Sequence, residues 1–474
     1  MNKSKENITL YVDLDGTLIK TDLLFESLLA LLKKNILYVF AILFWSIKGR
    51  ANLKFEVARK TDLSASDLPL NTEFYNYLQE QRETGRQMVL ISGSNQRSAN
   101  TVGEHIGLFD AIYGSDRTTN LKAKQKLLKI KELSDGRDFA YAGNSADDII
   151  VWRSAAQVIM VNCHDRISKL VRDKDKLEFD HPPGVSRKLL KAIRPHQWLK
   201  NLLVFVPLIL SHQILDPKLL ASLIITFISF SLCASSVYIL NDLVDIIDDR
   251  RHWNKHKRPF AAGDLPLIAG FIAGPLMFIA GATIALTLPI NFQFIFLLYW
   301  LVNLLYSFYL KQLFIVDVAT LSLLYTLRII AGAEAIYIET TTWLLGFSFA
   351  LFFGLAIVKR VTELLNVISD GGYVIPGRAY NRNQLRMLST AGIVSSAIAI
   401  SIFALYISAP ETTELYDSPL ILWAILPLLI CLFYRIWRSA LTFKMNEDPV
   451  LFALTDRSGQ LIVLVCGFLL WLAS

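Results

Sequence analysis

The sequence predicts two unlike domains. Residues 1–185 are expected to form an α/β domain with a parallel, Rossmann-like sheet, and residues 186–474 an all-α membrane bundle of about nine transmembrane helices. Of the 474 residues, 53% are hydrophobic and 19% are charged, a composition too apolar for an ordinary soluble protein. Charged residues recur every few positions up to about Arg187, whereas long uncharged runs begin near Trp198. The bilayer must therefore be the solvent of the second part.

Short apolar strands alternate with helical stretches in the first domain. The strands are expected at Ile8–Val12, Met88–Ile91 and Phe139–Ala142, and polar residues follow each of them. Such alternation is typical of an open parallel sheet whose site lies at the carboxyl ends of the strands. Asp13 and Asp15 follow the first strand and project to the same side, because successive side chains of a strand alternate.

An apolar stretch, Leu23–Trp45, separates the first two strands. Two lysines, Lys33 and Lys34, interrupt it, and a membrane crossing here would separate the polar residues that end the first and second strands. We therefore expect a helical cap, over about residues 20–85, that lies on the bilayer through an apolar face.

The second domain contains apolar runs close to the ~20 residues that a helix needs to cross a bilayer. They lie at residues 199–215, 218–240, 265–287, 290–309, 313–336, 343–358, 388–409, 419–437 and 459–473. About nine helical spans follow from these runs.

Lysine and arginine crowd the segment before the first run and then every second loop, and the intervening loops are nearly free of them. The positive-inside rule then predicts a multi-pass protein of the inner or plasma membrane, with the first domain cytoplasmic and the C-terminus outside. Met1–Thr9 lacks the charged-then-apolar pattern of a cleavable signal, in agreement with a cytoplasmic first domain. The net charge of +7 is explained by topology and ligand binding, so nucleic acid is not an expected partner.

Three carboxylates mark the end of the second span. Asp242, Asp245 and Asp249 recur at helical spacing and share one face. Like charges this close repel one another unless a cation joins them, and hard oxygen ligands suit Mg²⁺. A basic run suited to phosphate follows, comprising His252, Lys255, Lys257 and Arg258. The alternative is a solvated interfacial loop of mixed charge, although carboxylates at a membrane edge are costly and usually functional.

With Asn241, these carboxylates match the motif N-D-x-x-D-x-x-x-D, and the segment Ala192–Ser474 resembles the UbiA superfamily of intramembrane prenyltransferases. The resemblance implies a nine-helix bundle with a central cavity open to the membrane, and Mg²⁺ as the cofactor. Members that use isoprenyl diphosphates usually carry a second motif, D-x-x-x-D, but here Asp317 is followed four positions on by Leu321.

The residues at that place instead resemble the decaprenyl-phosphate phosphoribosyltransferase-like branch, in Tyr306–Lys311, Asp317 and Arg328. This branch implies phosphoribosyl diphosphate as the donor and a polyprenyl phosphate as the acceptor. The substrate-binding residues that it implies are Lys200, Asn241, His252, Lys255, Arg258, Tyr306, Lys311, Asp317, Arg328, Lys359 and Arg360.

Some of these residues have simpler explanations when taken alone. Lys359 and Arg360 could mark a cytoplasmic helix end, and Tyr306 could be an aromatic of the membrane interface. Arg328 lies deep inside an apolar run, where an unpaired charge costs several kcal/mol. We expect it to face a polar cavity or to pair with a carboxylate or a phosphate.

The first domain resembles the haloacid dehalogenase (HAD) superfamily of phosphohydrolases over about Asn7–Asn162. The resemblance rests on Asp13-Leu14-Asp15-Gly16-Thr17, Ser92-Gly93-Ser94 and Gly143-Asn144-Ser145-Ala146-Asp147-Asp148. It implies that Asp13 is the nucleophile, Asp15 the general acid and base, and Ser92 a phosphate ligand, with Asp13, Asp15 and Asp148 at a Mg²⁺ site. Lys122, Lys124 and Lys126 are candidates for the phosphate-binding lysine, and the spacing after Asn120-Leu121 favours Lys126.

The superfamily has a carboxylate where this sequence has Asn144, so an inert head that only docks or regulates is the alternative for this domain. For the whole chain the sequence favours transfer of 5-phosphoribose to a polyprenyl phosphate, with the head removing the 5-phosphate. One alternative is transfer of an isoprenyl chain from an isoprenyl diphosphate to an aromatic or other acceptor. Another is a non-catalytic membrane scaffold with an inert head.

Overall fold

The computed structural model describes residues 8–171, 174, 176–179, 184–252, 254–375, 377–443, 445 and 448–473. The expectation about a signal sequence falls mostly on residues 1–7, outside this described part. The chain divides into two compact units, which are described one at a time. The first unit is Met1–Ile193 with Ile239–Ala273, and the second is Arg194–Tyr238 with Gly274–Ser474. The segment that carries Asp242, Asp245 and Asp249 thus belongs to the same unit as the N-terminal domain.

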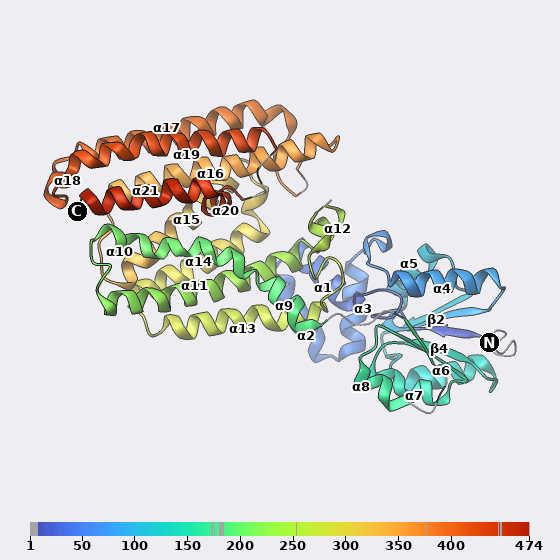
Figure 1. Cartoon of the computed structure of the whole chain (residues 1–474). Helices are drawn as coiled ribbons and strands as arrows, with labels where there is room; N and C mark the ends of the chain where they lie inside the picture. Colours follow the sequence, from blue (N-terminus) through green and yellow to red (C-terminus); the bar gives the residue numbers. More distant parts are fainter. Residues whose placement is uncertain are drawn as a thin grey trace. The chain divides into compact units, whose positions relative to one another are not determined.

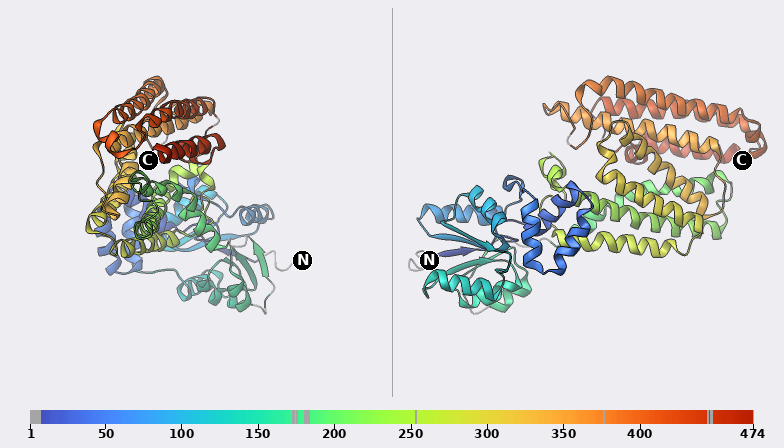
Figure 2. Two further views of the ribbon diagram at one scale, coloured as in Figure 1. Left: turned by 60° about the vertical axis from the view of Figure 1, so that its left-hand side comes forward. Right: turned by 180° about the vertical axis from the view of Figure 1, so that it is seen from behind.

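The first unit contains a six-stranded parallel sheet in the order β3-β2-β1-β4-β5-β6, visible in Figures 1 and 2. The strands are β1 (Leu10–Val12), β2 (Met88–Asn95), β3 (Ala111–Ser115), β4 (Ala140–Gly143), β5 (Gln157–Val161) and β6 (Lys176–Phe179). The predicted parallel α/β domain is present, and the three strands expected from the sequence are β1, β2 and β4. These three are neighbours, so the polar residues that follow them meet at one edge of the sheet.

Helices cover both faces of this sheet. They are α4 (Thr72–Glu83), α5 (Gln96–Ile106), α6 (Lys124–Ser134) and α7 (Ile149–Ser154). Leu10 and Val12 pack on one face with Phe74 of α4, whereas Tyr11 packs on the other with Trp152 of α7. Because β1 is buried on both faces, its side chains are apolar without alternation, as parallel sheets require.

The stretch expected to form a cap is helical, and it consists of α1 (Leu23–Lys34), α2 (Tyr38–Ile47) and α3 (Arg50–Lys60). Asp22 caps α1 by accepting a hydrogen bond from the backbone N–H of Leu24. Helix α2 has no buried residue, and the side chains of Phe40 and Ile47 are 69% and 84% exposed. An apolar helix with so much exposed surface fits the interface of a bilayer.

This helix provides a first prediction. In a background whose four cysteines are replaced by alanine, a nitroxide at Phe44→Cys will collide more with lipid-soluble oxygen than with an aqueous nickel complex. A nitroxide at Lys60→Cys, on the exposed end of α3, is the matched control and will show the opposite preference. Equal access of the nickel complex to both labels in proteoliposomes would rule out membrane contact by α2.

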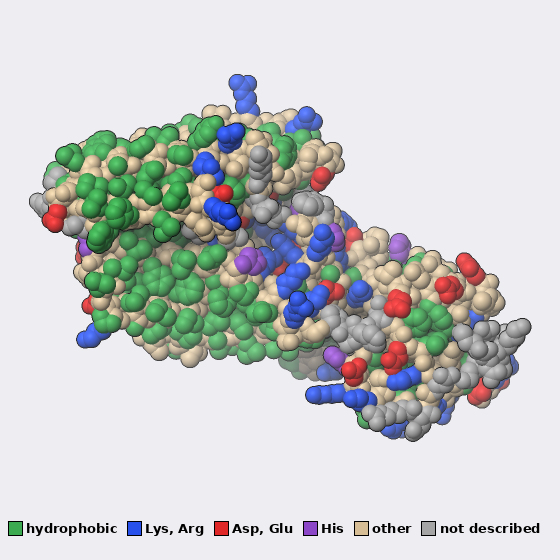
Figure 3. All heavy atoms as spheres, viewed as in Figure 1, with side chains coloured by type: hydrophobic (Ala, Val, Ile, Leu, Met, Phe, Trp, Pro, Cys, Tyr) green, Lys and Arg blue, Asp and Glu red, His purple; other side chains and the backbone are tan. Residues whose placement is uncertain are grey.

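Seven helices of the described residues are long and apolar enough to cross a membrane. They are Pro217–Val244 (α11), Leu267–Ala285 (α13), Ile290–Phe308 (α14), Val316–Ala335 (α15), Thr342–Ser369 (α16), Arg382–Ile407 (mainly α17) and Pro419–Leu441 (mainly α19). Hydrophobic side chains cover their visible surfaces (Figure 3). The chain is therefore built to cross the bilayer several times.

Two of the nine predicted spans are not among these seven helices. The 199–215 run holds a 3₁₀ helix, η5 (Pro195–Phe205), followed by the short α10 (Val206–Leu210), and the last run is the 17-residue α21 (Arg457–Ala473). The count of nine spans and their orientation remain predictions.

Candidate functional site

The candidate site of the first unit lies at the carboxyl ends of β1, β2 and β4. Asp13 directly follows β1, and its backbone N–H donates to the carbonyl of Ala142 in β4 at 2.9 Å. Its Oδ1 accepts from the backbone N–H of Leu14 at 2.8 Å, which fixes the carboxylate at the sheet edge. The turn continues through Gly16 at a φ of +73°, where a Cβ atom would lie 2.0 Å from the Asn144 amide nitrogen. Only glycine fits there.

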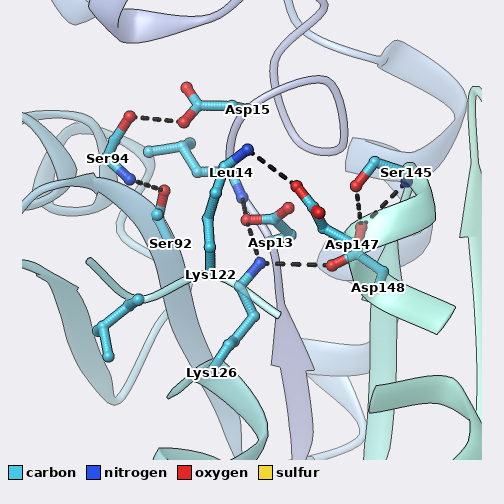
Figure 4. A network of polar contacts seen from close by, with 12 residues as sticks. Asp13, Leu14, Asp15, Ser92, Ser94, Lys122, Lys126, Ser145, Asp147 and Asp148 are labelled. Atoms are coloured by element: carbon cyan, nitrogen blue, oxygen red, sulfur yellow. Dashed lines mark hydrogen bonds and ion pairs between the residues drawn. The ribbon is translucent and has the colours of Figure 1, made fainter. Parts of the chain in front are cut away.

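Lys126 is buried against Asp13, with Nζ 2.9 Å from Oδ1, and it also contacts Asp148 at 3.4 Å (Figure 4). Its ammonium group donates to the Tyr141 hydroxyl at 2.8 Å. Burial raises the pKa of Asp13 to about 6, although Lys126 acts in the opposite direction. Burial alone would lower the pKa of Lys126, but Asp13 and Asp148 raise it above its usual value. The ammonium group therefore stays charged beside the carboxylate.

The structure thus separates the three candidate lysines. Lys126 reaches Asp13, whereas Lys122 is exposed and pairs with Asp147 at 2.8 Å, and Lys124 is exposed on α6. Lys126 is the lysine that the spacing favours, so the geometry agrees with that choice.

Asp15 and Ser92 lie on the same edge. Ser94 donates from its hydroxyl to Oδ2 of Asp15 at 2.5 Å, and the backbone N–H of Leu23 donates to Oδ1 at 2.9 Å. Ser92 is fully buried, and its hydroxyl accepts from the backbone N–H of Ser94 at 3.0 Å (Figure 4). Burial, aided by the neighbouring Asp22, raises the pKa of Asp15 to about 7. A carboxyl group with such a pKa can both give and take a proton near neutral pH.

Asp148 is held by protein donors on both oxygens. Oδ2 accepts from the backbone N–H groups of Asn144 and Ser145 and from the Ser145 hydroxyl, and Oδ1 accepts from Tyr141. Burial alone would raise its pKa, but Lys126 and these hydrogen bonds lower it. Asp13 and Asp15 fit a divalent cation as hard oxygen donors, whereas Asp148 is better suited in this arrangement to hold Lys126.

The Asp-rich segment keeps its helical spacing across a break between α11 and α12 (Ile246–Arg251). The backbone N–H of Asp245 donates to the carbonyl of Asn241 at 2.9 Å, and that of Asp249 donates to Asp245 at 2.8 Å. Asp242 and Asp249 are buried and share one cation, because Nη1 of Arg258 lies 3.1 Å and 2.6 Å from their carboxylates.

The carboxylates of Asp242 and Asp249 therefore converge on the same nitrogen of Arg258. Burial raises the pKa of Asp249 to about 6, and Arg258 opposes this rise. No group of three His, Cys, Asp or Glu side chains in the described residues is arranged to hold a metal ion. The donor set nevertheless fits Mg²⁺, since buried hard oxygens already converge on a positive charge that an ion could replace.

The basic residues after this segment have separate contacts. Nδ1 of the half-buried His252 faces the backbone N–H groups of Asn254 and Lys255, at 3.2 Å and 3.4 Å. Two arginines that the sequence did not single out form ion pairs with the cap region. Arg250 pairs with Glu26 of α1 at 2.6 Å, and Arg251 pairs with Asp67 at 2.6 Å.

In the second unit, Asp317 is the centre of a buried ionic cluster. Its carboxylate accepts from Arg360 at 2.5 Å and 3.0 Å, from Arg378 at 3.0 Å and from the Tyr306 hydroxyl at 2.8 Å. Arg360 is fully buried and also pairs with Glu363 at 2.5 Å. The predicted residues Tyr306, Asp317 and Arg360 thus meet. Arg378, which the sequence marked only as one positive charge of a basic loop, joins them.

Arg328 is buried among neutral groups. It donates to the Asn201 side chain at 2.9 Å, to the Leu324 carbonyl at 2.6 Å and to the Tyr299 hydroxyl at 2.8 Å. A carboxylate, which was one of the three expected surroundings, is not among these contacts, and amide, carbonyl and phenol oxygens accept from the guanidinium instead. Lys200 is buried and pairs with Asp448, Lys311 is buried, and Lys359 is half-buried.

Residues 202–455 of the 474 match the model of the UbiA prenyltransferase family. The chain belongs to this family. The Sinorhizobium fredii protein y4nM is 32% identical to this UbiA-family chain over 464 residues, which are 96% of this chain and 89% of that protein. A decaprenyl-phosphate phosphoribosyltransferase from Mycolicibacterium smegmatis is 31% identical over 229 residues, 47% of this chain and 72% of that protein.

Among solved structures, a UbiA homologue from Archaeoglobus fulgidus bound to GPP and Mg²⁺ has a TM-score of 0.47 and 18% identity, covering 60% of this chain and 99% of that one. Family membership and the seven apolar helices together make this UbiA-family chain a multi-pass membrane protein.

Proposed function

We propose that the UbiA part of the chain transfers a 5-phosphoribosyl group from phosphoribosyl diphosphate to a polyprenyl phosphate. The observation that carries this proposal is that protein side chains occupy the carboxylate of Asp317. Arg360, Arg378 and Tyr306 engage its carboxylate, and Leu321 stands where a second acidic motif would have its other carboxylate. A donor site built on two acidic motifs is thus disfavoured, and the similarity to a decaprenyl-phosphate phosphoribosyltransferase supports the same choice.

In this reaction an oxygen of the polyprenyl phosphate attacks C1 of the ribose, and the bond from C1 to the diphosphate breaks. The diphosphate leaves with the electron pair. Asp242, Asp245 and Asp249 would hold Mg²⁺, and the ion would supply positive charge to offset the charge that develops on the diphosphate. Arg258 contacts Asp242 and Asp249 in this structure, and with an ion between these carboxylates its guanidinium would be able to bind a phosphate oxygen.

Two parallel reactions with different donors test which group the enzyme transfers. Purified protein in detergent is given Mg²⁺, polyprenyl phosphate and labelled phosphoribosyl diphosphate, and a parallel reaction contains an isoprenyl diphosphate with an aromatic acceptor. We expect label to enter the lipid fraction only in the first reaction. Product in the second reaction alone would instead support isoprenyl transfer, and product in neither would favour the non-catalytic scaffold.

We also propose that the N-terminal domain, residues 1–185, which we call the head, hydrolyses phosphate monoesters. Asp13, with Lys126 beside it and Ser92 on the neighbouring strand, supports a nucleophilic carboxylate facing a phosphate site. An Asp13 oxygen attacks phosphorus, the ester P–O bond breaks, and the leaving alkoxide takes a proton from Asp15. Water then attacks the aspartyl-phosphate, with Asp15 as the base, and releases inorganic phosphate. Removal of the 5-phosphate from the transferase product is the step that we assign to this chemistry.

A further inference from the structure

The candidate site of the head opens into a pocket of about 300 Å³, and one wall of this pocket is apolar. Asp13, Asp15 and Lys126 line it. Phe25 of α1 and the segment Pro266–Ile268 also line it. Helix α13 begins at Leu267 and is one of the seven helices able to cross a membrane. All of these residues belong to the first unit, so a membrane helix begins in the wall of the pocket.

Several contacts fix this wall in place. A Cβ atom at Gly263, whose φ is +73°, would lie 2.5 Å from Cβ of Lys20, so the loop before α13 packs directly on the pocket rim. The rings of Phe25 and Phe271 pack with their centroids 5.5 Å apart. Such close packing indicates a formed wall.

A buried ion pair ties the same wall to the Asp-rich segment. Glu26 accepts from Nη2 and Nη1 of Arg250 at 2.6 Å and 3.2 Å, and it also accepts from the hydroxyl of Thr21, a pocket residue, at 2.6 Å. Arg250 also donates from Nε to the carbonyl of Ala261 at 3.1 Å. An arginine that donates from all three of its side-chain nitrogens fixes the geometry of the elements that it joins.

The apolar surface continues from the pocket along α13. Ile268 lines the pocket and is 43% exposed, and Ile272, one turn further on the same face, is 54% exposed. The pocket itself is at the lower end of the size range for small-molecule sites and is too small for a long lipid chain. An apolar chain attached to a bound phosphate would therefore leave the pocket along this face.

Charged side chains of both signs line the pocket, and its aspartates are Asp13, Asp15, Asp22, Asp147 and Asp148. Lys20, Lys54 and Lys122 line it in addition to Lys126. Lys54 reaches from α3 to the Asn120 side chain at 3.2 Å and to the carbonyl of Gly93. The ammonium groups offset the carboxylates, and an ammonium group beside Asp13 can bind the phosphate of a monoester through charge-assisted hydrogen bonds.

We infer that the head acts on a phosphate monoester carried by a membrane lipid. Its phosphate reaches Asp13, and its apolar part lies along Ile268 and Ile272. This inference rests on the proposed hydrolysis and adds the path along α13 on which the lipid part of the substrate lies. The bond that breaks is the ester P–O bond, and water supplies the oxygen of the released phosphate.

The experiment compares three monoesters with the full-length protein in lipid nanodiscs, by phosphate release. Hydrolysis of p-nitrophenyl phosphate reports the chemistry alone, and ethyl and dodecyl phosphate differ only in the apolar chain. We expect kcat/KM for dodecyl phosphate to exceed that for ethyl phosphate by at least about tenfold, since each buried CH₂ contributes about 0.8 kcal/mol. Ile268→Ala will lower this ratio by about threefold or more, because it removes part of the apolar face.

The matched control is Ile290→Ala, which makes the same change at a 60% exposed position at the start of α14, outside the pocket. It will leave the ratio unchanged. Equal kcat/KM for ethyl and dodecyl phosphate, with p-nitrophenyl phosphate hydrolysed, overturns the lipid inference and leaves the hydrolase proposal standing. If none of the three esters is hydrolysed, the hydrolase proposal itself is overturned.

Discussion

Asp13→Asn will lower phosphate monoester hydrolysis by at least about 1000-fold, because an amide cannot act as the nucleophile toward phosphorus. The variant should still fold. Lys126 keeps its contacts with Asp148 and with the Tyr141 hydroxyl, so its buried ammonium is not left uncompensated. Transfer to lipid will continue, since Asp13 is not part of the Asp-rich segment. The measurement is phosphate release from p-nitrophenyl phosphate, with label transfer to lipid measured in the same preparation.

Asp135→Asn is the matched control for this variant. Asp135 ends α6 with a φ of 50°, a conformation that asparagine adopts readily, and it lies outside the pocket. Its hydrolysis rate should equal that of the unchanged protein. If Asp13→Asn keeps full hydrolysis, another group or a contaminating enzyme is responsible. If the unchanged protein has no hydrolysis either, the inert head suggested by Asn144 becomes the better explanation.

The edge of the sheet that carries this site was predictable because its signals are local. An apolar strand followed by Asp-x-Asp-Gly requires only the alternation of side chains and the turn that Gly16 permits. The choice of Lys126 depends on spacing along one short segment. The strands β3, β5 and β6 were missed, since their neighbouring polar residues carry no comparable signal.

The ion pairs could not be predicted, because they join residues far apart in the sequence. Glu26 and Arg250 are separated by 224 positions, and each alone is compatible with an exposed helix surface. Arg378 looked like one positive charge of a polar loop, yet it completes the cluster around Asp317. Charge patterns predict topology, but the pairing of individual charges depends on the tertiary fold.

The first predicted span shows that hydropathy does not predict where a helix is interrupted. The run near 199–215 is apolar enough for a span, but the 3₁₀ helix that begins at Pro195 continues into it, and the short helix α10 follows with Pro207 in its first turn. A Cβ at Gly332 would lie 2.0 Å from the carbonyl oxygen of Val204, so the backbone of this segment packs directly on α15. Apolarity alone does not specify a continuous helix.

The Asp-rich segment leads to the second large effect. Asp242→Asn will lower the transfer of label from phosphoribosyl diphosphate to lipid by about 100-fold or more, because a carboxylate that stabilises the leaving diphosphate through Mg²⁺ is lost. The buried site becomes less negative, while Arg258 keeps its contact with Asp249 at 2.6 Å. The fold should therefore persist. A chelator should abolish transfer by the unchanged protein, and Mg²⁺ should restore it.

Asp248→Asn makes the same chemical change in the same segment. Asp248 is outside the N-D-x-x-D-x-x-x-D pattern and pairs with Lys33 at 2.7 Å on a partly exposed surface, where an ion pair contributes at most about 1 kcal/mol. Its transfer rate should stay within about threefold of the unchanged protein, with the same Mg²⁺ requirement. Equal losses in Asp242→Asn and Asp248→Asn would mean that the segment needs negative charge only for its folding. A loss confined to Asp242→Asn, with a raised Mg²⁺ requirement, would identify the convergence point of Asp242 and Asp249 as the metal site.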